Sequence, residues 1–227
     1  MYYLSQMNRK IKFAEGEYYH IYNRGVDKRD IFLDKSDYNR FISLLFNANS
    51  INPVRTRRTS SGQGFTSTIS RGETLTNIGA WCLMTNHFHI LLKSKDDFGV
   101  SKFLQKVTTA YTMYFNQKYN RSGALFQGVF KSEYVDRDEY LKYLFSYIHL
   151  NPIKFIENSW KNKGIRDIKR VLDFLDNYNY SSYFDYLFDS RPEYKIITKE
   201  VFPEYFLSVD DFKNNILEWL KFRPYQD

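Results

Sequence analysis

The spacing of hydrophobic and polar residues in the first half of the chain predicts a mixture of strands and helices. Residues 17–25 are rich in Tyr and Ile and stop at Asn-Arg-Gly, which indicates a strand followed by a turn. Residues 34–49 open with polar capping residues and then repeat apolar positions three and four apart, the spacing of one helix face. Residues 75–85 and 88–94 predict two strands joined by a tight turn.

Two longer helical patterns follow. Residues 98–120 and 136–151 carry apolar side chains along one helical face, and Pro152 ends the second pattern. Residues 120–135, between them, predict a loop with a short extended piece. The order strand, helix, strand, strand, helix is that of the ferredoxin-like split βαβ plan. We therefore expect an α+β fold with helices on one face of a sheet and the other face open.

Two segments lack this regular pattern. Residues 50–73 are dominated by Ser, Thr, Gly and Arg without any period, which predicts a mobile basic insertion. Residues 156–227 are more irregular than the body but contain helical stretches, and they predict a C-terminal helical appendage that packs on the body. We therefore divide the chain into a first domain, residues 1–155, and a helical extension, residues 156–227.

The composition is that of a globular protein with a packed core. Hydrophobic residues make up 43% of the chain and aromatic residues 19%, so a disordered chain is excluded. The single cysteine, Cys82, excludes an internal disulfide and a cysteine-rich zinc site. The N-terminus lacks an apolar signal core, and no apolar run is long enough to cross a bilayer. We expect a cytoplasmic protein without a membrane partner.

The charge of the chain is unevenly distributed. Its net charge of +7 divides into +12 on residues 1–172 and −5 on residues 173–227. A basic body favours a polyanionic partner such as nucleic acid. Within the insertion, the candidate phosphate contacts are Arg55, Arg57, Arg58 and Arg71. A solvated loop is the alternative interpretation of these arginines.

The stretch TNHFHILLK, residues 85–93, holds two of the four histidines. Because side chains alternate along a strand, His87 and His89 would point to one sheet face and Phe88 to the core. Two neighbouring imidazoles are able to share one divalent metal ion. The alternative is a pair of half-buried histidines with ordinary hydrogen bonds. A phosphoester metallohydrolase is disfavoured, because only two further histidines remain as ligands.

A site with so few protein ligands needs a nucleophile, and the 20 tyrosines supply candidates. Tyr147 and Asn151 are four residues apart in a predicted helix, so a phenol and a carboxamide share one helix face. A phenolate can attack a phosphate whose charge is neutralised and whose approach is fixed. Spacing alone does not distinguish Tyr147 from Tyr111 or Tyr143 as the nucleophile. The alternative interpretation of Tyr147 is an aromatic side chain that packs in the core.

The segment AWCLMTNHFHILLK resembles the HUH motif (His, hydrophobic, His) of the single-tyrosine, IS200-like insertion-sequence transposases, and in particular of the REP-associated tyrosine transposases. Four further segments agree with this family in the same order, namely YYHIYNRG, YFNQKYNRSGALFQGVFKS, YLKYLFSYIHLNPIK and NYNYSSYFDYL. The resemblance covers roughly residues 15–190.

The resemblance implies an enzyme that cuts and rejoins single-stranded or hairpin DNA in the bacterial cytoplasm. Tyr147 would attack the scissile phosphate and form a 5′-phosphotyrosine bond. The divalent ion, Mg²⁺ or Mn²⁺, would be held by His87, His89 and Asn151. Better-known relatives carry glutamine at the last position, and the shorter asparagine could act through a bridging water. Candidate DNA contacts are Arg24, Gln127 and Lys131.

Several alternatives stay open at this point. His20 is a candidate for the general base, and an ordinary core or surface histidine is the alternative. The family contains monomers and homodimers, so we expect either state. A domesticated descendant that binds hairpin DNA or RNA without cutting it is the alternative function. Candidate aromatic platforms for unpaired bases, each with core packing as its alternative, are Tyr19, Trp81 and Phe126.

Overall fold

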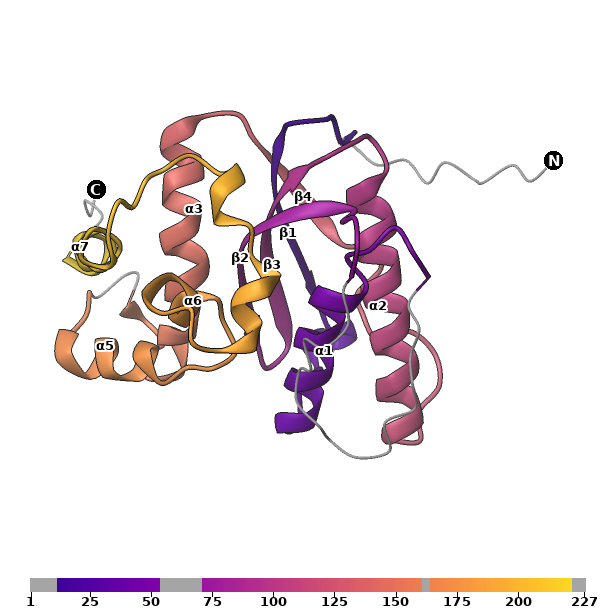
Figure 1. Ribbon diagram of the computed structural model, residues 1–227. Coiled ribbons are helices and arrows are strands. Elements are labelled where there is room, and N and C mark those ends of the chain that lie inside the picture. Colours follow the sequence, from indigo (N-terminus) through magenta and orange to yellow (C-terminus); the bar gives the residue numbers. More distant parts are fainter. Residues whose placement is uncertain (1–11, 54–70, 161–163, 222–227) are drawn as a thin grey trace.

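A four-stranded antiparallel sheet, in the order β2-β3-β1-β4, divides the molecule into two layers of helices (Figure 1). The computed structural model describes residues 12–53, 71–160 and 164–221. The strands are β1 (Tyr18–Arg24), β2 (Thr76–Met84), β3 (His87–Ser94) and β4 (Lys131–Val135). This order with its intervening helices confirms the expected ferredoxin-like α+β plan.

The first face of the sheet is covered by α1 (Lys35–Asn47) and α2 (Gly99–Lys118), as the sequence pattern predicts. Helix α1 begins with a capping box, in which the Asp34 carboxylate accepts hydrogen bonds from the backbone of the first turn. Phe88 of β3 is fully buried against these helices, with its ring 5.0 Å from that of Phe41. The three candidate base-stacking aromatics, Tyr19, Trp81 and Phe126, belong to this core, so core packing holds for all of them.

The second face of the sheet carries α3 (Asp138–Leu150) over β2 and β3. Its apolar stripe packs on small and apolar side chains of the two strands. The contacting residues are Leu141, Leu144, Phe145 and Ile148 of the helix and Ala80, Cys82, Met84 and Leu91 of the sheet. The face expected to be open is therefore open only beyond α3. An amphipathic helix must bury its apolar stripe, and the inner strands offered the apolar surface to do so.

The chain after α3 covers the outer edge of β2. It contains a 3-10 helix at Asn151–Phe155 and then α5 (Ile168–Asp176), α6 (Tyr183–Leu187), a 3-10 helix at Pro192–Ile196, another at Lys199–Val201, and α7 (Val209–Lys221). The Leu83 amide donates to the Tyr180 carbonyl, the Ser182 amide donates to the Trp81 carbonyl, and the Thr198 amide donates to the Ile78 carbonyl, each over 2.9 Å. Edge groups of β2 that would otherwise lack partners are paired in this way.

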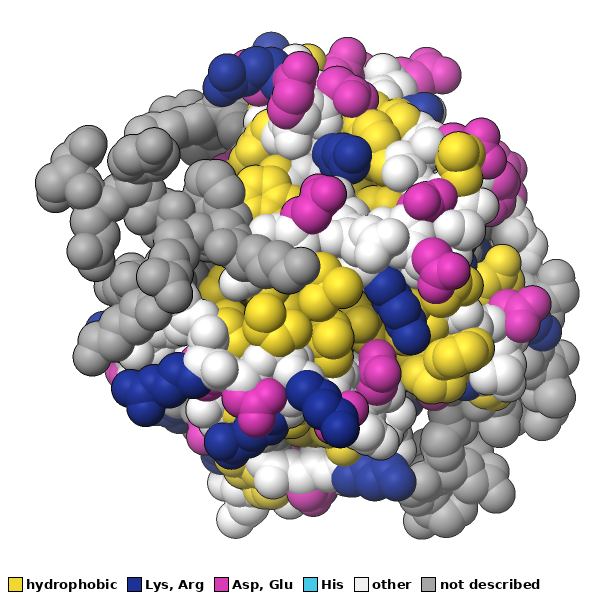
Figure 2. Space-filling model, turned by 90° about the vertical axis from the view of Figure 1, so that its left-hand side faces the viewer, with side chains coloured by type: hydrophobic (Ala, Val, Ile, Leu, Met, Phe, Trp, Pro, Cys, Tyr) yellow, Lys and Arg dark blue, Asp and Glu magenta, His cyan; other side chains and the backbone are white. Residues whose placement is uncertain are grey.

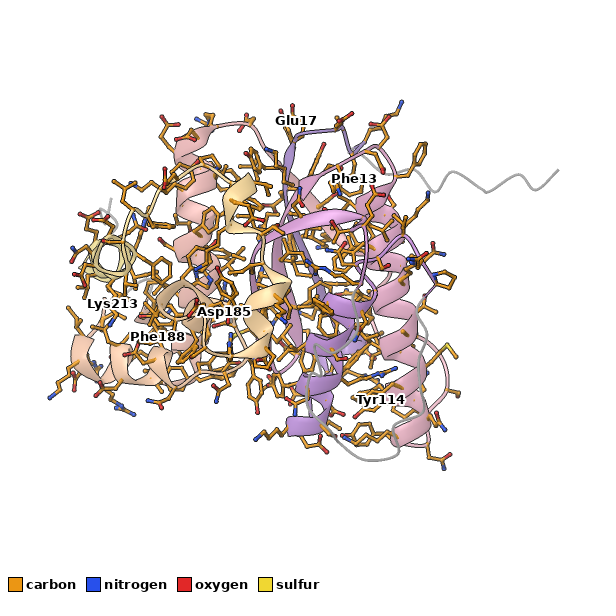
Figure 3. The ribbon with its side chains drawn as sticks, in the orientation of Figure 1. Phe13, Glu17, Tyr114, Asp185, Phe188 and Lys213 are labelled. Atoms are coloured by element: carbon orange, nitrogen blue, oxygen red, sulfur yellow. The ribbon has the colours of Figure 1, made fainter. Side chains whose placement is uncertain are left out.

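A buried ion pair holds this covering segment in place. The Arg191 guanidinium donates to both carboxylate oxygens of Asp185, over 2.6 and 2.7 Å, and also to the Ser181 carbonyl. Asp185 lies within the C-terminal layer (Figure 3). On the outer face of the same layer, acidic side chains are scattered among basic and apolar ones (Figure 2). The expected acidic character of the tail is thus spread over its surface.

The basic insertion is described only at its two ends. The candidate contacts Arg55, Arg57 and Arg58 lie outside the described residues. The guanidinium of Arg71 is 4.6 Å from the centre of the Phe46 ring, so this arginine packs on the body. No helix within the described ranges is long and apolar enough to span a membrane.

The burial of Phe88 predicts that its truncation destabilises the fold. Phe88→Ala should lower the free energy of unfolding by about 3–5 kcal/mol, because it leaves a cavity in the core beneath β3. The same truncation at Phe98, whose side chain is 66% exposed, should change it by less than about 0.5 kcal/mol. Urea unfolding of both variants measures the difference. Equal losses in the two variants would show that β3 does not turn Phe88 into the core.

Candidate active site

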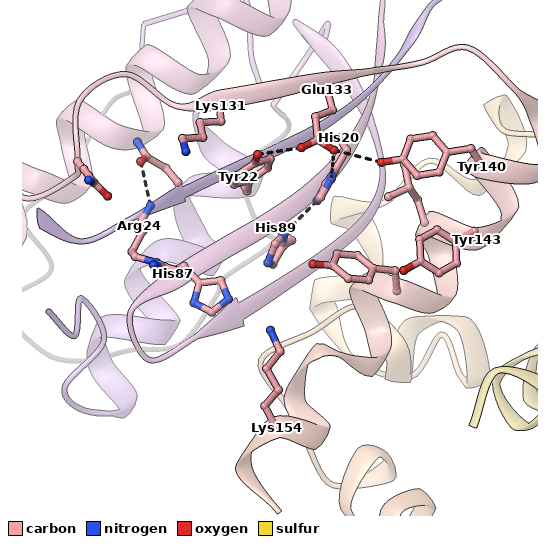
Figure 4. A pocket seen from close by; sticks show the side chains of 14 residues that line it. His20, Tyr22, Arg24, His87, His89, Lys131, Glu133, Tyr140, Tyr143 and Lys154 are labelled. Carbon is pink, nitrogen blue, oxygen red and sulfur yellow. Dashed lines mark hydrogen bonds and ion pairs between the residues drawn. The ribbon is translucent and has the colours of Figure 1, made fainter. Parts of the chain in front are cut away.

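A pocket of about 440 Å³ opens on the second face of the sheet, beside α3 (Figure 4). Its lining comes from β1, β3 and β4, from α3, and from the short 3-10 helix after α3. The pocket lies beside α3, which packs mainly on β2 and β3 and meets the polar positions of β1 and β4 through tyrosine side chains. Charged, phenolic and imidazole side chains gather here on one surface.

His87 and His89 both line this pocket, as the alternation along β3 predicts. Their ring centres are 5.1 Å apart, and the ring planes are nearly perpendicular. Nδ1 of His87 lies 2.6 Å from the Asn86 side-chain oxygen, and Nδ1 of His89 lies 2.9 Å from Nε2 of His20. Each imidazole is thus oriented by a hydrogen bond at Nδ1.

These hydrogen bonds determine where the ring protons lie. The Asn86 amide group donates to the Lys28 carbonyl, so its oxygen faces His87 and accepts the Nδ1 proton. In neutral His87 the lone pair is therefore on Nε2. For His89 we likewise place the proton on Nδ1, which then donates to Nε2 of His20. Both histidines then carry the tautomer that ligates a metal through Nε2.

Glu133 of β4 lies at the far end of this row of side chains. Nδ1 of His20 is 3.6 Å from one Glu133 oxygen, and the hydroxyls of Tyr22 and Tyr140 donate to the carboxylate over 2.8 and 3.1 Å. Burial raises the pKa of Glu133, but the Tyr22 hydrogen bond and the charge of His20 outweigh it, so the net pKa lies below its ordinary value. An ionised carboxylate therefore anchors the row Glu133, His20, His89 (Figure 4).

The pKa of His87 is lowered to about 4, first by burial and then by the positive charges of Lys154 and Arg24. Burial also lowers the pKa of His20, while the Glu133 carboxylate opposes this shift. Protonated imidazole cannot bind a metal ion, because its lone pair is occupied. The surroundings of His87 therefore keep it in the ligating form at neutral pH.

Tyr147 of α3 lines the pocket, and its ring meets the histidines edge-on. The centre of its ring is 5.6 Å from that of His89 and 5.8 Å from that of His20. Burial raises the pKa of Tyr147, the Glu133 carboxylate raises it further, and the side chain of Asn151 opposes the rise. The helix thus brings a phenol ring against His89 and His20.

The alternative tyrosines occupy different places. Tyr111 is fully buried on the opposite face of the sheet, where its hydroxyl donates to the Ile31 carbonyl. Tyr143 lines the same pocket one turn before Tyr147, and its ring packs 4.7 Å from that of Trp219. Burial in the core removes Tyr111 as a nucleophile and leaves Tyr147 and Tyr143 of the three candidates.

Asn151 lies at the end of α3 but does not line the pocket. It is 1% exposed, its amide nitrogen donates to the Tyr147 carbonyl over 2.8 Å, and its oxygen accepts from the Lys154 ammonium over 3.3 Å. Lys154 occupies the pocket wall instead. The role of Asn151 as the third metal ligand stays a prediction.

The three candidate DNA contacts of the body, Arg24, Gln127 and Lys131, all line the pocket. The Asn-Arg-Gly turn places Arg24 at the end of β1, where the backbone amide of Gln127 donates to the Arg24 carbonyl over 2.8 Å. A Cβ atom on Gly25 would lie 2.3 Å from the Arg29 carbonyl oxygen, so this tight turn requires glycine. The turn therefore brings a guanidinium beside the histidine pair.

Sequence reasoning missed Glu133, Tyr22 and Lys154 as pocket residues. Tyr22 had a usable signal, because it is two positions from His20 in a strand and must share its face. Glu133 had none, since the pairing of β4 with β1 is not visible in so short an extended segment. Lys154 follows the helix that Pro152 ends, and its direction depends on the turn after that helix.

The side chains present suit a divalent ion with several open positions. Among the described residues, no group of three or more His, Cys, Asp and Glu side chains could form a metal cage. Two neutral imidazoles in a solvent-filled pocket would hold such an ion and leave room for water and phosphate oxygens. Two imidazoles could take a divalent transition-metal ion such as Mn²⁺, and the identity of the ion stays a prediction.

Residues 67–151 of the chain match the family model described as "Transposase IS200 like". A search of curated proteins found no match. Among solved structures, the chain is similar to one described as "Structure of the REP associates tyrosine transposase bound to a REP hairpin". That likeness has 14% identity and a TM-score of 0.49, and it covers 83% of this chain and 89% of the other. The matched segment contains His87, His89, Tyr147 and Asn151.

Proposed function

We propose that the protein is a metal-dependent single-stranded DNA endonuclease and strand transferase that acts on hairpin DNA through a 5′-phosphotyrosine. The observation that carries this proposal is the contact of the Tyr147 ring with His20 and His89 inside a basic pocket. A phenol, paired imidazoles and phosphate-binding cations are the groups that transesterification of a phosphodiester requires. Hairpin DNA is the substrate that the family resemblance implies.

In the proposed reaction, the Tyr147 hydroxyl oxygen forms a bond to phosphorus while the bond from phosphorus to the 3′ oxygen breaks. The DNA 5′ end stays on the tyrosine, and the 3′ oxygen leaves as a hydroxyl after taking a proton from solvent. The phenol must lose its own proton as it attacks. In the tautomers assigned above, the lone pair on Nε2 of His20 accepts the Nδ1 proton of His89, so the phenol proton passes to pocket solvent rather than to His20.

His87 and His89 would hold the divalent ion through Nε2. Asn151, the third ligand expected from the sequence, would first have to release Lys154, because its oxygen accepts from that ammonium. A bound Mg²⁺ or Mn²⁺ supplies charge neutralisation at a non-bridging phosphate oxygen. Glu133 and His20 fix the orientation of the His89 ring, and Asn86 fixes that of His87. Preorganised ligands of this kind lose little free energy to reorganisation when the ion binds.

Single-stranded DNA would lie across the part of the sheet that α3 leaves open. Arg24 and Lys131 would bind its phosphates, and Gln127 would contact the strand between them. Each phosphate contact releases counterions, so affinity should fall steeply as salt concentration rises.

Tyr147→Phe should abolish the covalent protein–DNA adduct and leave DNA binding within about threefold, because only the attacking oxygen is lost. The assay incubates labelled DNA hairpins carrying a 5′ single-stranded flank with Mn²⁺ and separates adducts under denaturing conditions. Tyr143→Phe is the matched control and should still form the adduct. An adduct that persists in Tyr147→Phe and disappears in Tyr143→Phe would show that Tyr143, and not Tyr147, is the nucleophile. Binding without an adduct in the unaltered protein would favour the non-catalytic alternative.

His87→Ala should remove Mn²⁺ binding in calorimetric titrations, since one of two imidazole ligands is lost. Glu133→Gln should weaken Mn²⁺ binding about 10–100-fold, because His20, which orients His89, loses its anionic neighbour. Lys142→Met, at an exposed position of α3, is the control and should bind Mn²⁺ normally. Undiminished Mn²⁺ affinity in His87→Ala would remove the histidine pair as the metal site.

The ring of His87 should titrate near pH 4 in the metal-free protein, measured by the NMR shifts of its ring protons, instead of near its ordinary value of 6.5. The fold favours neutral His87, so this residue's contribution to stability is complete above about pH 6.5 and is lost as pH falls to about 4. Lys154→Met should move the midpoint upward, because it removes one of the two neighbouring cations. A midpoint at 6.5 in the unaltered protein would contradict the buried, cation-flanked environment.

A further inference from the structure

Lys154 is a pocket residue to which neither the sequence motifs nor the family resemblance gave a role. It lies in the 3-10 helix Asn151–Phe155, directly after the tyrosine helix. Its side chain is half-buried, lines the pocket and points toward His87 and His89 (Figure 4). Its ammonium donates to the Asn151 side-chain oxygen over 3.3 Å.

The charge of Lys154 is not balanced by the protein. Within the described residues no carboxylate forms an ion pair with it, and the charged groups that act on it include the cationic Arg24. The carboxylate that lines the pocket, Glu133, is engaged by Tyr22, Tyr140 and His20. Partial desolvation of an ammonium without an anionic partner costs free energy. Binding an anion from outside the protein offsets this cost.

Asn151 holds this ammonium in relation to the nucleophile. Its amide nitrogen donates to the Tyr147 carbonyl, and its oxygen accepts from Lys154. Only one orientation of the carboxamide satisfies both partners, since a carbonyl needs a donor and an ammonium needs an acceptor. One buried side chain therefore links the backbone at Tyr147 to the lysine head group.

We propose that Lys154 is a catalytic residue whose ammonium binds a non-bridging oxygen of the scissile phosphate, and that Asn151 is the residue that positions it. This inference rests on the proposed strand-transfer function. While the bond from Tyr147 to phosphorus forms and the bond to the 3′ oxygen breaks, negative charge accumulates on the non-bridging oxygens. The ammonium stabilises that charge and neither gains nor loses a proton in the step.

Lys154→Met should slow adduct formation about 100–1000-fold, the usual effect of removing one donor from a developing oxyanion. The probe is a pool of labelled DNA hairpins with a randomised 5′ single-stranded flank, with Mn²⁺ present. Lys154→Arg should recover part of the rate, because it restores a cation. Lys142→Met, on the exposed side of α3, should react at the unaltered rate. Thermal unfolding within a few degrees of the unaltered protein checks that each variant folds.

A second readout tests the contact itself. Once the adduct has mapped the scissile phosphate, a neutral methylphosphonate is placed there and DNA binding is measured without metal in the Tyr147→Phe background. The neutral group should weaken binding about tenfold when Lys154 is present and should have little effect in Lys154→Met, since the charged hydrogen bond is already gone. Equal weakening in both backgrounds would overturn the contact, even if Lys154→Met is less stable.

The role of Asn151 is tested by combining variants. If Asn151 acts through Lys154, the double variant Asn151→Ala, Lys154→Met should react no more slowly than Lys154→Met alone, and Asn151→Ala should keep its Mn²⁺ affinity within about twofold. A large loss of Mn²⁺ affinity in Asn151→Ala would make it a metal ligand and overturn its positioning role.

No adduct in the unaltered protein would overturn the proposed function and this inference together. A normal rate in Lys154→Met would overturn this inference alone.

Discussion

The two-residue period of β3 is the constraint on which the rest of the structure depends. One face of this strand must bury Phe88 and Ile90 beneath α1 and α2, so the other face necessarily presents His87 and His89. A shift of one residue in register would bury two imidazoles in an apolar core and expose two large apolar side chains. The core thus enforces the position of the histidine pair, and the chemistry of the pocket is fixed by packing on the far side of the sheet.

Helix α3 supplies the second half of the site through the same kind of packing. Leu144 and Ile148 bind it to β2 and β3, and this docking turns Tyr147 toward His20 and His89. The helix packs mainly on β2 and β3, and Glu133 of β4 and Tyr22 of β1 form the polar floor of the pocket beside it. The apolar half of this sheet face therefore holds the helix, and the polar half lines the pocket.

Local patterns in the sequence were sufficient for the elements and for the histidine face. The alternation in 85–93 and the i, i+4 relation of Tyr147 and Asn151 are properties of neighbouring residues, so they are readable before any tertiary contact is known. The choice between Tyr147 and Tyr111 is not local, because it depends on which side of the sheet each helix takes. The same holds for Glu133 and Lys154, which reach the pocket through the pairing of β4 with β1 and through the turn after α3.

The C-terminal segment has one further consequence through its hydrogen bonds to β2. Along Ile78, Trp81 and Leu83, the outward-facing backbone groups of this edge are already satisfied within the chain. A second molecule cannot extend the sheet by adding a strand at these positions without first displacing the segment anchored by Asp185 and Arg191. Any self-association on this side must proceed through side-chain surfaces, and the protein is protected there from aggregation by strand addition.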